Sequence, residues 1–428
     1  MNHNTQNDKI EAIDSETLVG GIDIGSEYHF IRFFTDRKIE LSKKPFKFEN
    51  NQEGFDQIIG LIEDLKAKYH KKDVYLGMEP TGHYWFNLMI ALEFKGYHVV
   101  IVNPMHVKKS KELDDNSPAK NDRKDPKVIA GLVIEGRYQK PYLPDGVYAE
   151  LRSFNNLIEN ATEEMTCKKN QIARWFAIYF PNFKDAFSDY TLKSAMLILK
   201  VAPLPADILK LGEEGVNKIW REAKLRGVGM KKAKELVEAA KCTVGMQRAP
   251  KSATLEIRHL IEDFECLSER RMELETEAAE LLKQVPNADK LQEIKGVGFK
   301  TTLGFVAEIG DLTRFDNAKQ IQKLAGLSIV NDESCKHVGE HHISHRGRKR
   351  LRYTMYLAGV SVIAHNEAFA EIYQHLITRS ENPLKKMQAV IAVSCKLIRI
   401  FYGVLAHGIT FDENKMLRDI TWYGKDAA

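Results

Sequence analysis

The chain has 428 residues, which is too long for one compact core and suits two or three domains. Charged residues make up 29% of it, but 63 Lys and Arg against 59 Asp and Glu leave a formal net charge of only +4. No stretch approaches the roughly 20 apolar residues that a membrane-spanning helix needs, so we expect no membrane partner. The five cysteines form no Cys-x-x-Cys pair, which favours a reducing cytoplasm over a zinc or disulfide scaffold.

Residues 1–17 are polar, lack an apolar signal core and are expected to form a flexible tail. Within residues 18–146, short apolar runs typical of strands alternate with segments whose apolar residues recur at helical spacing. The predicted strands are 19–25, 29–34, about 45–48, 74–79 and 98–102, and the predicted helices are 54–69 and 84–95. Three strands followed by a helix–strand–helix–strand order predict a layered α/β domain with a mixed sheet.

Residues 147–288 have a helical pattern. A helix is expected at 148–180, and from Ile257 to Val285 apolar residues recur at alternating three- and four-residue steps, interrupted by Arg271. This 3.5-residue repeat predicts a coiled coil. It could join two copies of the chain or pack within one chain on the 148–180 helix, and both arrangements stay open. Residues 289–428 are expected to form a second, mainly helical domain.

Four carboxylates are placed to act together in the first domain. Asp23 lies at the end of the first strand, Glu79 lies at the corresponding end of a later strand, and Asp122 and Asp125 are three residues apart. Oxygen ligands from separate elements suit Mg²⁺, which supports phosphoryl transfer. Each acid taken alone is more often structural or solvated than a metal ligand, and Asp125 followed by Pro126 is an ordinary helix start.

Two glycine-rich stretches have alternative interpretations. Residues 21–26 resemble the phosphate loop of actin-like ATPases, but the further glycine-rich nucleotide motifs of such kinases are missing downstream. Gly296, Gly298 and Lys300 resemble a helix-hairpin-helix turn, in which backbone N–H groups approach a DNA phosphate. A similar stretch at 225–233 is interpreted as an ordinary turn between helices.

The segment 334–352 has the most one-sided charge in the chain. Between residues 336 and 352, six cations face Glu340 alone, a surplus of +5 that predicts contact with a nucleic-acid backbone. The six cations are Lys336, Arg346, Arg348, Lys349, Arg350 and Arg352. Ser334 and Ser344 lie beside them, and composition alone makes neither of them a nucleophile.

Together these motifs resemble the Asp-Glu-Asp-Asp transposases of the insertion-sequence-110 family. The matching stretches are Gly21-Ile-Asp-Ile-Gly, Met78-Glu-Pro-Thr-Gly-His-Tyr, Val102-Asn-Pro, Lys120-Asn-Asp-Arg-Lys-Asp-Pro-Lys-Val-Ile-Ala, Ile294-Lys-Gly-Val-Gly, Phe315-Asp-Asn-Ala-Lys-Gln, Leu324-Ala-Gly-Leu and Ile343-Ser-His-Arg-Gly-Arg-Lys-Arg-Leu-Arg. They cover both globular domains in the expected order, so their joint occurrence is specific.

The resemblance implies a RuvC-like, RNase H fold in which Asp23, Glu79, Asp122 and Asp125 bind Mg²⁺, with Mn²⁺ as an alternative ion. It also implies a C-terminal transposase domain whose serine attacks DNA and forms a covalent phosphoserine. Such enzymes use a structured bridge RNA from the element that pairs with donor and target DNA. They act as dimers or tetramers, and a nucleoid-associated place in a prokaryotic cytoplasm is expected.

By position in the family motif, Ser334 corresponds to the nucleophile and Ser344 to a serine that contacts or supports DNA. Two residues depart from the family pattern, because Cys335 stands where glycine usually follows the nucleophile and Pro126 replaces an alanine. Two other functions remain open. One is a RuvC-like Mg²⁺-dependent endonuclease that hydrolyses DNA with water, and the other is a nucleic-acid-binding module with structural carboxylates.

Overall fold

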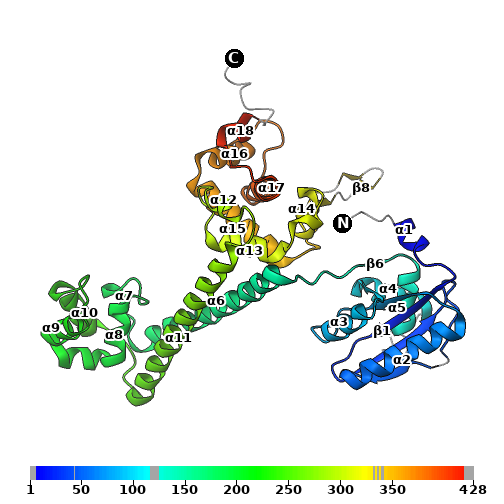
Figure 1. Ribbon diagram of the computed structural model, residues 1–428. Coiled ribbons are helices and arrows are strands. Elements are labelled where there is room, and N and C mark those ends of the chain that lie inside the picture. Colours follow the sequence, from blue (N-terminus) through cyan, green and yellow to red (C-terminus); the bar gives the residue numbers. More distant parts are fainter. Residues whose placement is uncertain are drawn as a thin grey trace. The chain divides into compact units, whose positions relative to one another are not determined.

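The computed structural model describes residues 6–42, 44–115, 125–330, 333–334, 337–338 and 342–418. The chain forms two compact units, Met1–Leu143 and Pro144–Ala428 (Figure 1). The first unit is α/β and the second is mainly helical, which confirms the predicted fold classes of the two globular parts.

The α/β unit is built on one six-stranded mixed sheet. Its strands are β1 (Thr17–Asp23), β2 (Tyr28–Phe34), β3 (Phe46–Glu49), β4 (Asp73–Met78), β5 (His98–Val102) and β6 (Tyr138–Gln139). They lie in the order β3-β2-β1-β4-β5-β6, with β1, β4 and β5 parallel and the other pairs antiparallel. The five predicted strands are confirmed, and the short β6 adds one that the sequence pattern did not indicate.

Helices cover both faces of this sheet. They are α2 (Gln52–Tyr69) and α3 (Phe86–Phe94) on one face, and α4 (Pro104–Asp115) and α5 (Asp125–Ile134) on the other. Side chains of a strand alternate between faces, so Leu18 and Ile22 of β1 join the core with α2 and α3, whereas Val19 joins the core with α5. Helix α2 begins where the Asn51 side chain accepts a hydrogen bond from the Gly54 N–H at 2.9 Å.

Helix α5 lies directly on the backbone of two strands. Gly21 of β1 and Gly77 of β4 are paired neighbours in the sheet. A Cβ added at Gly21 would lie 1.9 Å from the carbonyl oxygen of Pro126, and one added at Gly77 would lie 2.3 Å from Cγ2 of Val133. Side chains at these two positions would therefore push α5 off the sheet, so the glycines allow the close packing of the helix on β1 and β4.

We expect Gly21→Ala to lower the free energy of unfolding by about 1–3 kcal/mol, because the added methyl group meets backbone that can move only with α5. Chemical denaturation of the full chain, followed by circular dichroism, measures this change. Gly60→Ala on α2 is the matched control, since a Cβ there meets nothing within 4 Å. It should stabilise the helix by about 1 kcal/mol, and equal effects of the two substitutions would contradict the prediction.

The start of the chain differs from the predicted flexible tail. It contains helix α1 (Gln6–Glu11). The Gln6 amide donates to the Glu135 carbonyl oxygen at 3.0 Å, and the Lys9 ammonium donates to the Tyr138 carbonyl oxygen at 2.8 Å. Because polar side chains make these contacts, no apolar periodicity marked them in the sequence.

Two long helices organise the second unit, α6 (Gly146–Tyr179) and α11 (Pro250–Leu282). They lie side by side (Figure 1) and run antiparallel. Leu151, near the start of α6, shares a core with Ala278 near the end of α11. At the other end, the Trp175 indole N–H donates to the Ala253 carbonyl oxygen at 2.9 Å. The repeat in α11 thus packs within the chain, on the helix that was predicted at 148–180.

Arg271, which interrupts the apolar repeat, has a local ionic partner. Its Nε atom lies 3.4 Å from Oε1 of Glu275, one turn further along α11. The pair is an ionic contact between side chains one turn apart, and neither of the two facing atoms, which are buried, makes a hydrogen bond within the described residues.

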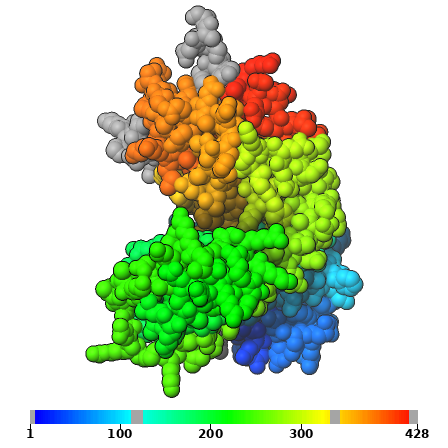
Figure 2. Space-filling view, turned by 90° about the vertical axis from the view of Figure 1, so that its left-hand side faces the viewer, coloured from blue at the N-terminus to red at the C-terminus, as the bar shows by residue number. Residues whose placement is uncertain are grey.

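The chain between α6 and α11 forms an insertion whose helices share a core with the adjoining ends of α6 and α11. Its helices are α7 (Phe183–Ala186), α8 (Lys193–Val201), α9 (Pro205–Glu222) and α10 (Met230–Cys242). Trp220 is fully buried in this core and its indole N–H donates to the Ser194 carbonyl oxygen at 3.0 Å. Figure 2 shows the insertion as a rounded body, coloured green. The helical pattern of residues 147–288 predicts helices here, but it gives no sign of this core.

The remaining chain forms a second helical core that includes the ends of α6 and α11. Its elements are α12 (Ala288–Gln292), α13 (Phe299–Ile309), the 3-10 helix η1 (Leu312–Arg314), α14 (Ala318–Leu324), α15 (Lys349–His365), α16 (Glu367–Thr378), α17 (Lys386–His407) and α18 (Glu413–Arg418). We expected no stretch of membrane-spanning character, and this is corrected: among the described residues α17 is long and apolar enough to cross a membrane. Its Val393, Leu397 and Phe401 side chains are buried in this core, so packing accounts for its apolar composition.

Candidate active site

The first two predicted carboxylates lie at one edge of the sheet. In the parallel pair of β1 and β4, Ile22 is the register partner of Met78. The next residue of each strand is Asp23 and Glu79, respectively, so the two acids follow paired positions at the carboxyl ends of adjacent strands. This is the arrangement that the sequence pattern predicted.

Helix α5 brings a third carboxylate to the same end of the sheet. Asp125 is its first residue, and Pro126, the next one, is buried with its carbonyl oxygen against Gly21 of β1. Gly21 lies two residues before Asp23. The start of α5 is therefore held over the end of the strand that bears Asp23, and the predicted helix start at Asp125 is confirmed. Asp122 lies outside the described residues.

Burial dominates the electrostatics of Glu79 at this edge. It raises the pKa of Glu79, the charge of Lys111 of α4 opposes the rise, and the charge of Asp125 adds a smaller rise. The Lys111 ammonium forms an ion pair with the Asp125 carboxylate. Lys111 thus supplies positive charge where the acids gather, and nothing in the sequence pattern had singled it out.

The side chains at this edge of the sheet can be compared with the ligands that a metal ion requires. Among the described residues, no three His, Cys, Asp or Glu side chains are grouped so as to hold a metal ion together. Asp23, Glu79 and Asp125 are nevertheless all carboxylates, the oxygen donors that Mg²⁺ prefers, and the pKa of Glu79 is raised because burial removes that carboxylate from water. The chemistry fits a hard divalent cation, but the described residues alone do not complete its coordination.

The predicted nucleophile lies in a β-hairpin of the helical unit. Two short antiparallel ladders join β7 (Ile329–Val330) to β10 (His342–Ile343) and β8 (Glu333–Ser334) to β9 (His337–Val338). Ser334 pairs with His337, so only two residues separate it from its partner across the turn. Figure 1 shows β8 projecting beyond α14. Lys336 falls outside the described residues.

Ser344 directly follows β10. Its backbone N–H donates to the Ser328 carbonyl oxygen at 2.8 Å. Both predicted serines therefore belong to the same β-hairpin segment, Ser334 near its turn and Ser344 at its base.

Three of the predicted phosphate-binding arginines have partners within the helical unit. Arg348 contacts Glu308 of α13, whose side chain is 8% exposed, with Nη1 to Oε2 at 3.2 Å. Arg350 pairs with Glu159 of α6, with Nε to Oε2 at 2.9 Å. Arg352 donates from Nη1 to the Ala325 carbonyl oxygen at 2.9 Å. The sequence predicts that all these cations face phosphates. In the structure, partners within the helical unit neutralise or orient three of the arginines.

Arg346 and Lys349 are exposed, as Arg350 is, but no ion pair engages either of these two within the described part of the chain. The two positions remain available to an anionic partner. Fewer cations of this segment thus remain for contact with DNA than the sequence predicts.

The predicted helix-hairpin-helix turn joins α12 to α13. Gly296 has a positive φ of 92°, and a Cβ there would lie 2.9 Å from Cα of Val362, so the glycine permits close packing on α15. Gly298 precedes the first residue of α13. The Lys300 ammonium lies 3.2 Å from Oε1 of Glu275. The turn is present as expected, and packing within the chain explains Gly296 without a ligand.

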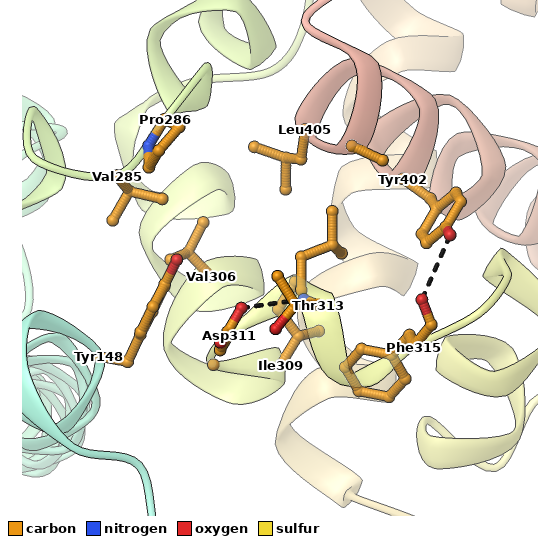
Figure 3. Close-up of a pocket in the computed structure, with 13 residues that line it drawn as sticks. Tyr148, Val285, Pro286, Val306, Ile309, Asp311, Thr313, Phe315, Tyr402 and Leu405 are labelled. Carbon is orange, nitrogen blue, oxygen red and sulfur yellow. Dashed lines mark hydrogen bonds between the residues drawn. The ribbon is translucent and has the colours of Figure 1, made fainter. Parts of the chain in front are cut away.

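A separate cavity of about 350 Å³ lies within the helical unit (Figure 3). Tyr148, Asp311 and Tyr402 are among its lining residues. The Asp311 carboxylate accepts a hydrogen bond from the Thr313 N–H at 2.9 Å, which caps η1. No predicted site residue lines this cavity, so it is not part of the candidate active site.

Comparison with known families assigns both units. A family model described as a transposase matches residues 20–181, and one described as the transposase IS116/IS110/IS902 family matches residues 288–374. The two matches span the four predicted carboxylates and the hairpin with its basic segment. The chain belongs to the IS110 family of transposases.

Relatives agree with this assignment. The transposase is 23% identical to a 44.8 kDa protein of insertion element IS116 from Streptomyces clavuligerus, over 90% of this chain and 94% of that protein. It is 31% identical to the pilin gene-inverting proteins of Moraxella bovis and Moraxella lacunata, over 29% of this chain and 39% of theirs. The transposase is accordingly an enzyme that acts on DNA.

Two residues of the site region could not be recognised from the sequence pattern. Lys111 was hidden because its role depends on Asp125, 14 residues away. Glu308 was hidden because an acid within an apolar helix gives no sign of the arginine that it binds 40 residues later. The signal that could have indicated these two ion pairs is a local excess of Lys and Arg in the same chain as an acid. That signal is common on protein surfaces, so it does not identify the partners.

Proposed function

We propose that the transposase cleaves and rejoins DNA with Mg²⁺, or Mn²⁺, held by Asp23, Glu79, Asp122 and Asp125, and with Ser334 as nucleophile. The observation that carries the proposal is the register of β1 and β4, which puts Asp23 and Glu79 on adjacent strand ends under the start of α5. A mixed sheet with helices on both faces also supports the RuvC-like, RNase H fold implied by the family resemblance.

The protein's part in metal binding is to hold carboxylates that repel one another. When bound, Mg²⁺ would polarise the scissile phosphate and stabilise charge on the leaving oxygen. Asp23 and Glu79 sit at strand ends whose backbones are fixed by the sheet, and Asp125 is fixed by the packing of α5 on Gly21. Lys111 balances the charge of Asp125 in the absence of the ion.

The serine step requires an accessible hydroxyl beside positive charge. In this proposal Ser334 Oγ loses its proton and bonds to phosphorus, while the bond from phosphorus to the leaving strand breaks and that strand's oxygen takes up a proton. A DNA hydroxyl then reverses these steps on a second strand and frees the serine. The place of Ser334 near the hairpin turn and the exposed Arg346 and Lys349 support this role.

The names of two relatives support a reaction that rejoins DNA strands over one that only hydrolyses them. Inverting a gene, the activity in the names of the two Moraxella proteins, requires that DNA ends be cut and joined again. An enzyme that only hydrolyses phosphodiesters would leave free ends. The Mg²⁺-dependent endonuclease is therefore the second candidate.

The family resemblance extends the proposal to recognition and assembly. We include a structured bridge RNA that pairs with donor and target DNA, a dimer or tetramer as the working form, and a nucleoid-associated place in a prokaryotic cytoplasm. The sequence motifs carry this part of the proposal, and the intramolecular partners of Arg348, Arg350 and Arg352 leave fewer cations for nucleic acid than the sequence analysis assigned.

The proposal is tested by incubating the purified chain with the RNA transcribed from its element and a supercoiled plasmid bearing the element end. With Mg²⁺ we expect a protein–DNA adduct that survives detergent denaturation, and with EDTA we expect none. Free cleaved ends without any adduct would instead identify the endonuclease. Cleavage that persists in EDTA would contradict the metal site.

A further inference from the structure

Lys111 is placed on α4 so that its side chain reaches the start of α5. Val107, one turn earlier on α4, is buried in the core that α4 and α5 share with the sheet. Residues four apart lie on the same face of a helix, so Lys111 follows Val107 on the face that packs toward α5. Figure 1 shows the two helices side by side. The packing of α4 therefore brings the Lys111 ammonium group to the Asp125 carboxylate.

The ion pair of Lys111 and Asp125 is partly withdrawn from solvent. The Lys111 side chain is 36% exposed and the Asp125 side chain is 17% exposed. Burial raises the pKa of the neighbouring Glu79, and the charge of Lys111 opposes that rise. The ammonium group thus acts on two of the predicted metal ligands, and salt screens it less in this partly buried place than on open surface.

A metal ion and Lys111 would compete for the Asp125 carboxylate. Both are positively charged, and on one carboxylate group they would lie a few ångströms apart and repel each other. The ion can also draw on the oxygens of Asp23 and Glu79, the ligands that Mg²⁺ prefers. The lysine has a long flexible stem and is partly exposed, so it is the partner that can move away.

An ammonium group released from Asp125 would remain beside the site, because buried Val107 fixes its helix on the core. A DNA phosphate is the anion expected there, since a Mg²⁺ ion on carboxylates commonly takes substrate phosphate as a further ligand. Lysine binds phosphate as a point charge, so a small swing of its stem is enough to change partners. One side chain can therefore serve the carboxylate without the ion and the DNA with it.

We propose that Lys111 exchanges partners: it holds Asp125 in the metal-free chain, leaves that carboxylate when the metal ion binds, and then contacts a phosphate of the DNA. This inference rests on the proposed function, because it takes Asp125 as a metal ligand. It adds a residue outside the four carboxylates and the hairpin, at a position that none of the matching family stretches includes. The exchange would couple the loading of the metal to the binding of DNA.

The first experiment measures the binding of Mn²⁺ alone to the full chain by isothermal titration calorimetry, without nucleic acid. Mn²⁺ takes the same oxygen ligands as Mg²⁺. We expect Lys111→Met to bind the ion about 10-fold more tightly, because the competing charge is gone. Lys111→Arg keeps the charge and should bind as the wild type does. Lys109→Met is the matched control, since it removes an exposed charge from the same helix, and its affinity should not change.

The sign of the change in affinity distinguishes exchange from simple support. Weaker binding by Lys111→Met would mean that the lysine only orients Asp125 for the ion, and either weaker or unchanged binding would overturn the exchange. Glu79→Gln separates this outcome from a failure of the proposed function. If Glu79→Gln binds Mn²⁺ as the wild type does, the metal site itself is wrong. If it loses the ion while Lys111→Met binds normally, only the exchange is wrong.

The second experiment follows Lys111 in the wild-type chain, so it does not depend on the folding of a variant. Brief acylation followed by mass spectrometry of the peptides measures how accessible each lysine is. Acylation of Lys111 should be about 5-fold faster with Mn²⁺ than without it, and slow again once DNA bearing the element end is added with its RNA. Lys109 should react equally in the metal-free and Mn²⁺-loaded chains. Acylation of Lys111 that does not rise with Mn²⁺, or does not fall with DNA, would overturn the exchange.

Discussion

Replacing Glu79 with glutamine is expected to reduce Mg²⁺-dependent strand cleavage at least ~100-fold, because a neutral amide cannot replace a carboxylate ligand at the sheet edge. The substitution should leave the fold intact. Burial raises the pKa of Glu79, so the charged side chain is less favourable in the folded metal-free chain than in the unfolded one, and the uncharged glutamine has the same shape. Cleavage rates in Mg²⁺ and unfolding curves in EDTA measure the two effects separately.

The sign of the pKa shift adds an independent readout. Since the pKa of Glu79 is raised in the folded chain, the folded state binds more protons than the unfolded state above the ordinary glutamate pKa. Stability without metal should therefore fall as the pH rises through the titration of Glu79, and Glu79→Gln should remove that part of the dependence. Glu53→Gln, on an exposed turn of α2, is the control. Wild-type cleavage by Glu79→Gln would show that this acid is structural.

Replacing Ser334 with alanine should abolish the covalent protein–DNA adduct completely, because no oxygen remains to bond to phosphorus. Ser344→Ala is the matched control, since it removes the same atom from the base of the same hairpin segment. We expect it to keep the adduct and at most to weaken DNA binding. Denaturing gels of radiolabelled DNA, with matched RNA and Mg²⁺, distinguish the two variants.

The reverse result would have a clear meaning. An adduct with Ser334→Ala and none with Ser344→Ala would assign the nucleophile to the base of the hairpin. If Ser334→Ala lost its adduct but cut DNA to free ends at the wild-type rate, water would be the attacking group. That outcome would favour the endonuclease.

The sequence could predict the α/β sheet and its acidic edge because both depend on local patterns. Short continuous apolar runs mark β1 and β4. Acids at the carboxyl ends of two such strands must share an edge once the strands are parallel neighbours. The long helices α6 and α11 were also predictable from their repeats, and the structure answers which partner α11 has within the described chain.

Other features depend on residues far apart in the chain, so no local pattern could predict them. Arg350 meets Glu159 across 191 positions of sequence, and Arg348 meets Glu308 across 40. A surplus of local charge looks the same whether its arginines face solvent or a distant carboxylate. The core of the insertion was missed for a related reason, since its helices are apolar on one face only and their mutual packing is a property of the fold.

The pairing of α6 with α11 has a mechanical consequence. A helix of 34 residues is about 50 Å long, and the two cores of the helical unit gather at its opposite ends. Two helices packed along their length resist bending far better than one, so the insertion sits on a stiff arm. A rotation of about 10° at the base of a rod of that length would carry its far end through roughly 9 Å. Small changes in side-chain packing where α6 meets α13 would thus be amplified into large displacements of the insertion.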